Sequence, residues 1–113
     1  MTHELPPPYD RAKLVELFGD DPKTLAEVER DFLDTARGAE REIRGTVDCT
    51  AIARAAHRLK GASGMIGAVT LHRLSETIER VAREGDLASA RRLFDLLSQE
   101  VRRLADHVGQ NAG

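Results

Sequence analysis

His57 is the residue of this sequence whose type and position are best suited to chemistry. It lies in residues 53–67, where apolar residues recur at steps of three and four and predict a helix with one buried face. At about 100° of rotation per residue, Leu59 and Ile66 fall almost opposite His57, so we expect the imidazole ring to face solvent. A neutral imidazole near pH 7 can attack phosphorus as a nucleophile. The pattern therefore fits a histidine that accepts a phosphoryl group, although an exposed histidine on a helix, taken alone, is usually an ordinary surface residue.

The neighbours of His57 along the same side of this helix are small or cationic. Lys60 supplies a positive charge, one turn away, for the oxygens of a phosphoryl group. A glycine inside a helix costs about 1 kcal/mol relative to alanine, so Gly61 and Gly64 indicate a requirement other than helix stability. We expect them to leave bare backbone where a partner approaches His57. The predicted docking surface comprises Ala53, Arg54, Arg58, Gly61 and Gly64.

The sequence gives little support for a metal-binding site or for a hydrolase site with a serine nucleophile. The four histidines, His3, His57, His72 and His107, form no cluster with other ligands, and zinc needs about four converging ligands. Ser63 falls on the core side of the His57 helix, and no nucleophile elbow surrounds it. We expect Ser63 to be a small packing residue that donates a hydrogen bond to a backbone carbonyl. The sequence therefore predicts neither a metal site nor a hydrolase site.

Composition limits the class of protein. A chain of 113 residues forms one domain, and with 41% hydrophobic but only 4% aromatic residues its core must be aliphatic. The net charge of −2 argues against nucleic-acid binding, which usually needs a basic face. The lone cysteine, Cys49, allows no internal disulfide. The first ten residues do not read as a signal peptide, and no apolar run approaches the roughly 20 residues that span a bilayer. We expect a cytoplasmic protein without membrane contact.

Periodicity and breaking residues divide the chain into five predicted helices. Asp21-Pro22 is a strong helix start, because aspartate caps exposed N–H groups and proline suits the first helical position. Gly45 and Gly85 close two of the helices. No segment shows sustained strand alternation, and short loops favour antiparallel neighbours. The predicted helices span about residues 10–18, 22–45, 48–67, 71–85 and 86–108.

These elements predict an all-α fold, an up-down antiparallel four-helix bundle with a short additional N-terminal helix packed across one end. Residues 1–9 contain three consecutive prolines and are expected to form a flexible proline-rich arm. The bundle is expected to occupy residues 10–108, and residues 109–113 to form a frayed C-terminus. Glu76 and Glu79 are expected in exposed ion pairs, each worth under about 1 kcal/mol, and His72 is expected at the surface.

Residues 57–67 resemble a known signature. Their sequence, His-Arg-Leu-Lys-Gly-Ala-Ser-Gly-Met-Ile-Gly, is similar to the pattern His-x-Leu-Lys-Gly-x-Ser-x-x-x-Gly of the histidine-phosphotransfer (HPt) domain family. Residues 17–22 and 74–86 resemble other parts of such domains, so that the resemblance covers nearly all of residues 10–108. The family is a monomeric helical bundle that relays phosphoryl groups between receiver aspartates in two-component phosphorelays.

The resemblance implies a role for each residue of the motif. His57 would be the phosphoacceptor, and Lys60 would assist the phosphoryl group electrostatically. Gly61 and Gly64 would clear the docking surface, while Ser63 and Gly67 support the motif.

The resemblance also implies partners. Members generally have no independent catalysis, because the partner receiver brings the acidic pocket and the Mg²⁺ ion. We therefore expect a phosphoryl carrier that is not an enzyme and has no cofactor of its own. The expected partners are receiver domains of response regulators and a hybrid histidine kinase. Met1 and the proline-rich arm favour a free-standing protein.

Two alternatives remain. The dimerisation and phosphoacceptor domain of a histidine kinase also presents a histidine on a helical bundle. There an acidic residue usually follows the histidine and a proline comes soon after, whereas here Arg58 follows and no proline appears after Pro22. The other alternative is a non-catalytic helical adaptor that binds a receiver or kinase without phosphotransfer. The intact Lys60 and Gly61 argue against it.

Overall fold

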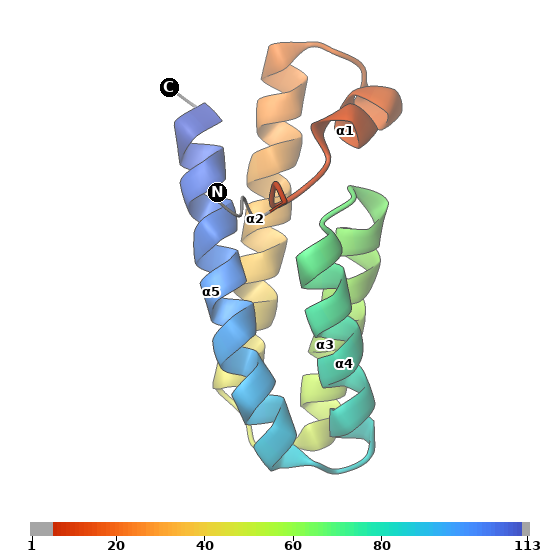
Figure 1. Cartoon of the computed structure of the whole chain (residues 1–113), viewed down its shortest axis with the longest axis vertical. Helices are drawn as coiled ribbons and strands as arrows, with labels where there is room; N and C mark the ends of the chain where they lie inside the picture. The colour runs from red at the N-terminus through yellow and green to blue at the C-terminus, as the bar shows by residue number, and fades with distance from the viewer. Residues whose placement is uncertain (1–5, 112–113) are drawn as a thin grey trace, which may run out of the picture.

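The computed structural model describes residues 6–111, which form five α-helices joined by short loops (Figure 1). These described residues contain no strand, which confirms the predicted all-α fold. His3 lies outside the described residues. The helices are α1 (Arg11–Phe18), α2 (Pro22–Arg44), α3 (Cys49–Met65), α4 (Val69–Arg83) and α5 (Leu87–Asn111).

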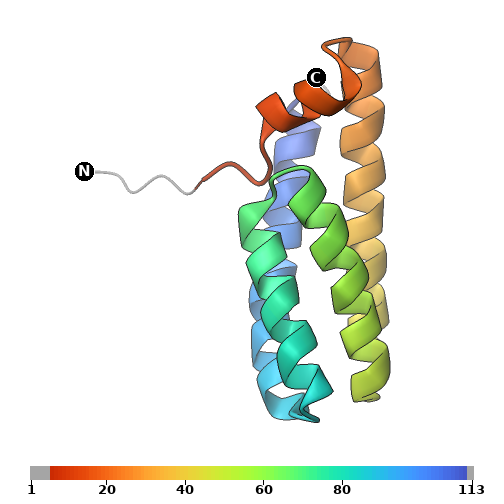
Figure 2. The ribbon, with the colours of Figure 1, turned by 90° about the vertical axis from the view of Figure 1, so that its right-hand side faces the viewer.

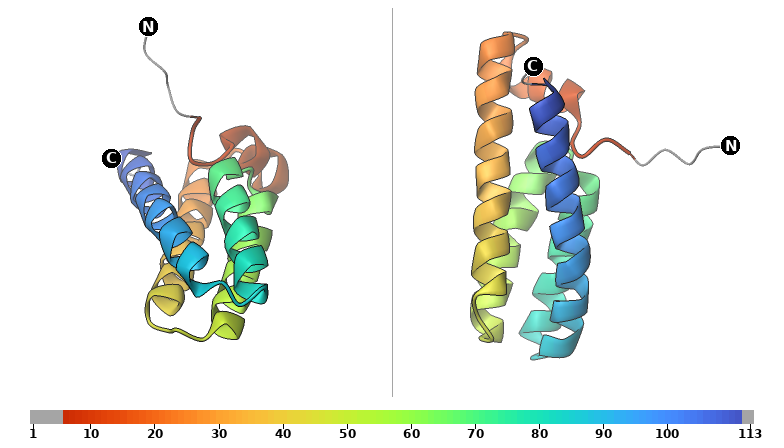
Figure 3. Two further views of the ribbon diagram at one scale, coloured as in Figure 1. Left: turned by 60° about the horizontal axis from the view of Figure 1, so that its bottom comes forward. Right: turned by 90° about the vertical axis from the view of Figure 1, so that its left-hand side faces the viewer.

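The four longer helices run up and down as an antiparallel bundle. The helix α3 packs against α4, α4 against α5, and α2 against both α3 and α5, so that each helix contacts two neighbours. The loops from α2 to α3 and from α4 to α5 lie at the same end of the bundle (Figure 3). The short α1 lies across the opposite end and contacts α2 (Figure 2). This arrangement confirms the predicted bundle with its additional N-terminal helix.

Aspartates fix where most of these helices begin. Their carboxylates accept hydrogen bonds from backbone N–H groups of the first turn, which have no partner inside the helix. Asp21, for example, accepts from the N–H of Thr24, and Pro22 then occupies the first helical position. The predicted start at Asp21-Pro22 is therefore confirmed. The other three aspartates that cap in this way are Asp10, Asp48 and Asp86.

The core between the helices is aliphatic, as the composition predicts. Small residues of α3, among them Ala55, Ala56 and Ser63, are fully buried and allow its neighbours to approach closely. None of the helices within residues 6–111 is long and apolar enough to span a membrane. The largest fully buried apolar side chains are Leu14, Leu25, Ile43, Ile52, Leu59, Leu71, Ile78, Leu97 and Leu104.

The first and last residues of the bundle differ from the boundaries that the sequence predicts. Pro8 and Tyr9, which the sequence places in the arm, are buried. The Tyr9 hydroxyl donates a hydrogen bond to Glu29 of α2, and its ring makes an edge contact with His107 of α5 at 5.1 Å between centroids. The core therefore begins at Tyr9, because a large aromatic side chain gains much from burial. At the C-terminus, α5 continues to Asn111, whereas the sequence predicts that the bundle ends at residue 108.

Candidate functional site

His57 lies in the middle of α3 with 61% of its side chain exposed. Leu59 and Ile66, on the opposite side of the helix, are buried. The predicted exposure of the imidazole is therefore confirmed, and it follows from the helical period of the apolar residues.

A glutamate of the neighbouring helix holds the ring of His57. Nδ1 of His57 lies 2.9 Å from Oε2 of Glu79, which comes from α4. Glu79 is only 6% exposed, so the prediction of an exposed ion pair at this residue is wrong. Glu76, by contrast, is exposed. The sequence pattern misses Glu79 because burial of a carboxylate depends on the cations that surround it.

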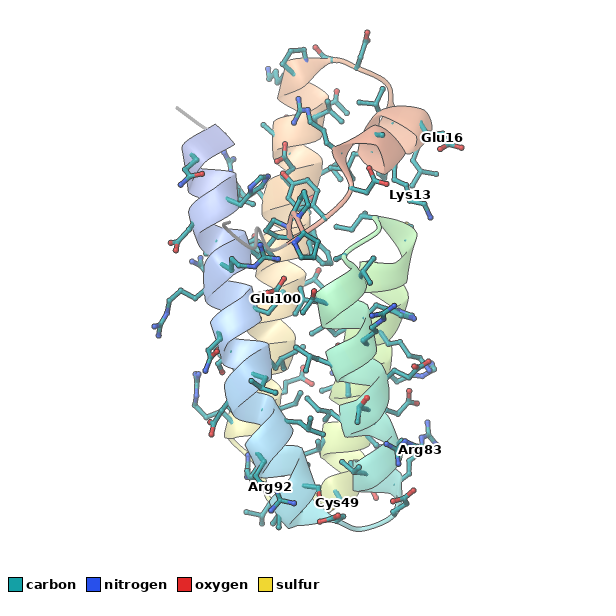
Figure 4. The ribbon with its side chains drawn as sticks, viewed as in Figure 1. Lys13, Glu16, Cys49, Arg83, Arg92 and Glu100 are labelled. Atoms are coloured by element: carbon teal, nitrogen blue, oxygen red, sulfur yellow. The ribbon has the colours of Figure 1, made fainter. Side chains whose placement is uncertain are left out.

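Two cations share the Glu79 carboxylate with His57. Nζ of Lys60 lies 2.8 Å from Oε1, and Arg83 donates to Oε2 through Nη2 at 2.7 Å and Nε at 3.2 Å. Figure 4 shows Arg83 on the side of α4 that faces away from α5. Lys60 is therefore one turn from His57, as predicted, and has a carboxylate partner that the sequence did not reveal.

The charge state of Glu79 determines which ring nitrogen of His57 carries the proton. Burial raises the pKa of the Glu79 carboxyl, but hydrogen bonds from Lys60, Arg83 and His57 outweigh it and lower the pKa from 4.5 to about 2. Glu79 is therefore ionised near neutral pH and only accepts hydrogen bonds. We assign the donating proton to Nδ1 of His57. In the neutral ring, Nε2 then carries the lone pair.

The two glycines of the motif have different surroundings. Gly61 is exposed, and a Cβ atom there would meet nothing within 4 Å. At Gly64 a Cβ would lie 3.2 Å from Nδ1 of His72. Nδ1 of His72 in turn donates to the backbone carbonyl of Lys60 at 3.0 Å. His72 is half-buried rather than at the surface, and Gly64 makes room for it within the fold.

The remaining predicted docking residues divide between exposed and buried positions. Arg54 and Arg58 are exposed, and Arg58 pairs with Glu42 of α2. Ala53 is buried, so its predicted exposure is wrong. The reason is that α4 packs closely along this side of α3, where Ala53 and Ala82 lie together.

Ser63 and Gly67 support the end of α3. Ser63 is fully buried, and its hydroxyl has no hydrogen-bond partner among residues 6–111, so the predicted bond to a carbonyl is not formed. Gly67 has φ +70°, a conformation that glycine adopts most readily. A Cβ there would lie 2.7 Å from Cβ of Asp10, whose N–H donates to the carbonyl of Ile66 at 3.0 Å. Gly67 therefore allows the start of α1 to pack against the end of α3.

The helices that carry the site are positively charged. Together α3 and α4 contain six arginines or lysines and two glutamates, whereas the whole chain has a net charge of −2. Such a local excess attracts anionic groups over distances of several ångströms. Within residues 6–111, no group of three His, Cys, Asp or Glu side chains is placed to hold a metal ion.

Comparison with known proteins identifies a family whose model matches the sequence of this chain. The family model described as the Hpt domain matches residues 14–107. No curated protein and no solved structure shows a significant match to the chain. Hpt domains are phosphocarrier modules rather than catalysts, and the match supports a phosphotransfer-type role in two-component signalling. Because the match covers most of the 113 residues, the chain belongs to the Hpt domain family.

Proposed function

We propose that this chain carries a phosphoryl group on Nε2 of His57 and relays it between aspartates of receiver domains. The observation that supports this proposal best is the pairing of an exposed imidazole with a buried, ionised carboxylate at its other nitrogen. Such a pairing orients a nucleophile without covering it. The open backbone at Gly61, one turn away, gives a partner access to the ring.

The proposed transfer balances without loss of a proton. The lone pair of Nε2 attacks the phosphorus atom of the receiver's aspartyl phosphate. The new P–N bond forms as the P–O bond to the aspartate breaks, and the aspartate leaves as a carboxylate. Nδ1 keeps its proton throughout, so the phosphorylated ring carries a positive charge that Glu79 offsets. The reverse reaction passes the group to the next receiver.

Lys60 has a supporting role in this proposal. Its ammonium group is held at 2.8 Å from Glu79, within a helical turn of the ring. From there its charge offsets the negative oxygens of the phosphoryl group. The acidic pocket and the Mg²⁺ ion belong to the receiver, so the chain needs no cofactor of its own.

The cellular setting also belongs to the proposal. We place the protein in the cytoplasm as a monomer that neither binds nucleic acid nor inserts into a membrane. Its proposed partners are receiver domains of response regulators and a hybrid histidine kinase.

Chemical phosphorylation tests the proposed function directly. The chain is treated with phosphoramidate, and the acid-labile adduct is mapped among the four histidines. We expect selective labelling of His57, and loss of the label when receiver domains and Mg²⁺ are added. Substitution His57→Gln should abolish this label and leave helicity by circular dichroism unchanged, because the side chain lies outside the core. The matched variant His72→Gln should still be labelled at His57.

Two results would contradict the proposal. One is equal labelling of all four histidines, which would mean that His57 has no special reactivity. The other is a label on His57 that no receiver removes. Either result would favour the alternative function, a helical adaptor that binds a receiver or kinase without phosphotransfer.

A further inference from the structure

A notch lies between α3 and α4, about one turn of α3 before His57. Most of the residues that line it have no part in the proposed transfer step. Thr50, Ala53 and Arg54 of α3 line it together with Ala82 and Arg83 of α4, and its volume is about 440 Å³. The two alanines are buried and form its floor. The two arginines come from opposite helices, and both are exposed, so their guanidinium groups form its rim.

Within residues 6–111, two of the six basic side chains of α3 and α4 pair with no carboxylate, Arg73 and Arg54, and of these two only Arg54 lines the notch. Arg54 makes no hydrogen bond or ion pair with any residue in the described range 6–111. The other basic side chains of the two helices are already engaged by carboxylates. These pairs are Arg58 with Glu42, Arg80 with Glu84, and Lys60 and Arg83 with Glu79. An exposed, unpaired arginine in a concave site has its full set of donors available.

Arg83 leaves part of its fork available as well. It donates to Glu79 through Nε and Nη2, which leaves Nη1 outside this interaction, and 64% of its side chain is exposed. A guanidinium fork matches the two oxygens of a carboxylate. The notch therefore offers donors from two sides and no acidic side chain of its own.

The position of the notch indicates which partner would fill it. Arg54 precedes His57 by three residues, about 4.5 Å along the helix axis. A domain large enough to deliver a phosphoryl group to His57 must extend over this region. The helix α3 bears three basic residues and no acidic one, so the complementary surface is acidic.

We propose that the notch binds an aspartate- or glutamate-bearing segment of the receiver domain that exchanges the phosphoryl group with His57. Arg54 is its principal contact and contributes to the choice among receivers. This inference rests on the proposed function. It concerns recognition at the edge of the interface, separate from the reacting atoms.

The test measures the rate of phosphoryl transfer against receiver concentration. The donor is the chain labelled with phosphoramidate, and the acceptor is the receiver domain that discharges it. Arg54→Glu should raise the half-saturating receiver concentration roughly tenfold and weaken its dependence on salt. The maximal rate should stay the same, because His57 and Glu79 are untouched. Arg54→Lys should give an intermediate value, since it keeps the charge but loses the fork.

The control makes the same change of charge on the far side of the bundle. Arg102 of α5 is exposed and, within the described part of the chain, unpaired, so Arg102→Glu should leave the half-saturating concentration unchanged. Equal half-saturating concentrations for Arg54→Glu and Arg102→Glu would overturn the proposed role of the notch while leaving the relay intact. Failure of every receiver to discharge the labelled wild-type chain would overturn the proposed function and, with it, this inference.

Discussion

Two buried glutamates organise two different regions of this molecule. Glu79 of α4 and Glu29 of α2 are 6% and 5% exposed. Each accepts hydrogen bonds from an arginine and from a ring: Glu79 from Arg83 and His57, Glu29 from Arg11 and Tyr9. The rings themselves differ, because His57 lies largely in solvent whereas Tyr9 is 3% exposed.

The difference shows how one arrangement of charges can serve reactivity or stability. A buried carboxylate is tolerated in both regions because a cation and a ring donor satisfy it. Near Glu29, the donor ring is enclosed by the core and joins residues before α1 to α2 and α5. Near Glu79, the donor ring is oriented but left accessible, so its second nitrogen can react. The degree of enclosure of the ring therefore separates the two roles.

The largest expected difference between the two regions is in the rate of phosphoryl transfer when the negative charge of each glutamate is removed. Glu79→Gln weakens the preference for a proton on Nδ1 of His57, so we expect transfer to slow between about tenfold and a hundredfold. Glu29→Gln should leave the transfer rate unchanged. The rates of labelling and discharge measure this effect, and ¹⁵N NMR of the imidazole reports the tautomer. Equal transfer rates in the two variants would contradict the orienting role of Glu79.

Acid should expose the contribution of Glu79 to stability. Its pKa is lowered from 4.5 to about 2 in the folded chain. The contribution is therefore complete above pH 4.5 and is lost as the pH falls towards 2, an effect on the order of 3 kcal/mol. Urea unfolding of the wild type and Glu79→Gln at pH 6.5, 4.5 and 3 should give free energies that converge at low pH. A constant difference across this range would argue against the lowered pKa.

A substitution in the Glu29 region should change the free energy of unfolding but not the rate of phosphoryl transfer. Tyr9→Phe removes the hydroxyl that donates to Glu29 and leaves the ring in place, so we expect a loss of about 1–2 kcal/mol in the free energy of unfolding. The transfer rate should be that of the wild type. Urea unfolding and the discharge assay measure the two quantities. A slower transfer in Tyr9→Phe would show that the two regions are coupled.

The smallest expected effect concerns the two glycines near His57. Gly61→Ala should raise the free energy of unfolding by roughly 0.5–1 kcal/mol, because alanine favours the helix and its Cβ meets nothing. Gly64→Ala should gain less or lose stability, since its Cβ would lie 3.2 Å from Nδ1 of His72. Thermal unfolding of the two variants gives the comparison. Equal stabilisation would mean that His72 shifts without cost.

The sequence by itself determined the helices and the outward direction of His57. Both are local properties, because the helical period fixes which residues of one segment share a face. Caps such as Asp21 and breakers such as Gly85 likewise act within a few residues. The motif around His57 also indicated the family that the matched residues 14–107 confirm.

Only the tertiary structure decided what surrounds His57. Glu79 is 22 positions away in the chain, and its contact with the ring depends on how α4 is rotated and shifted against α3. The same packing buries Ala53 and places His72 over Gly64. Tyr9 reaches Glu29 across 20 positions. The period of one helix carries no information about the register of its neighbour, so these contacts follow from side-chain packing between helices.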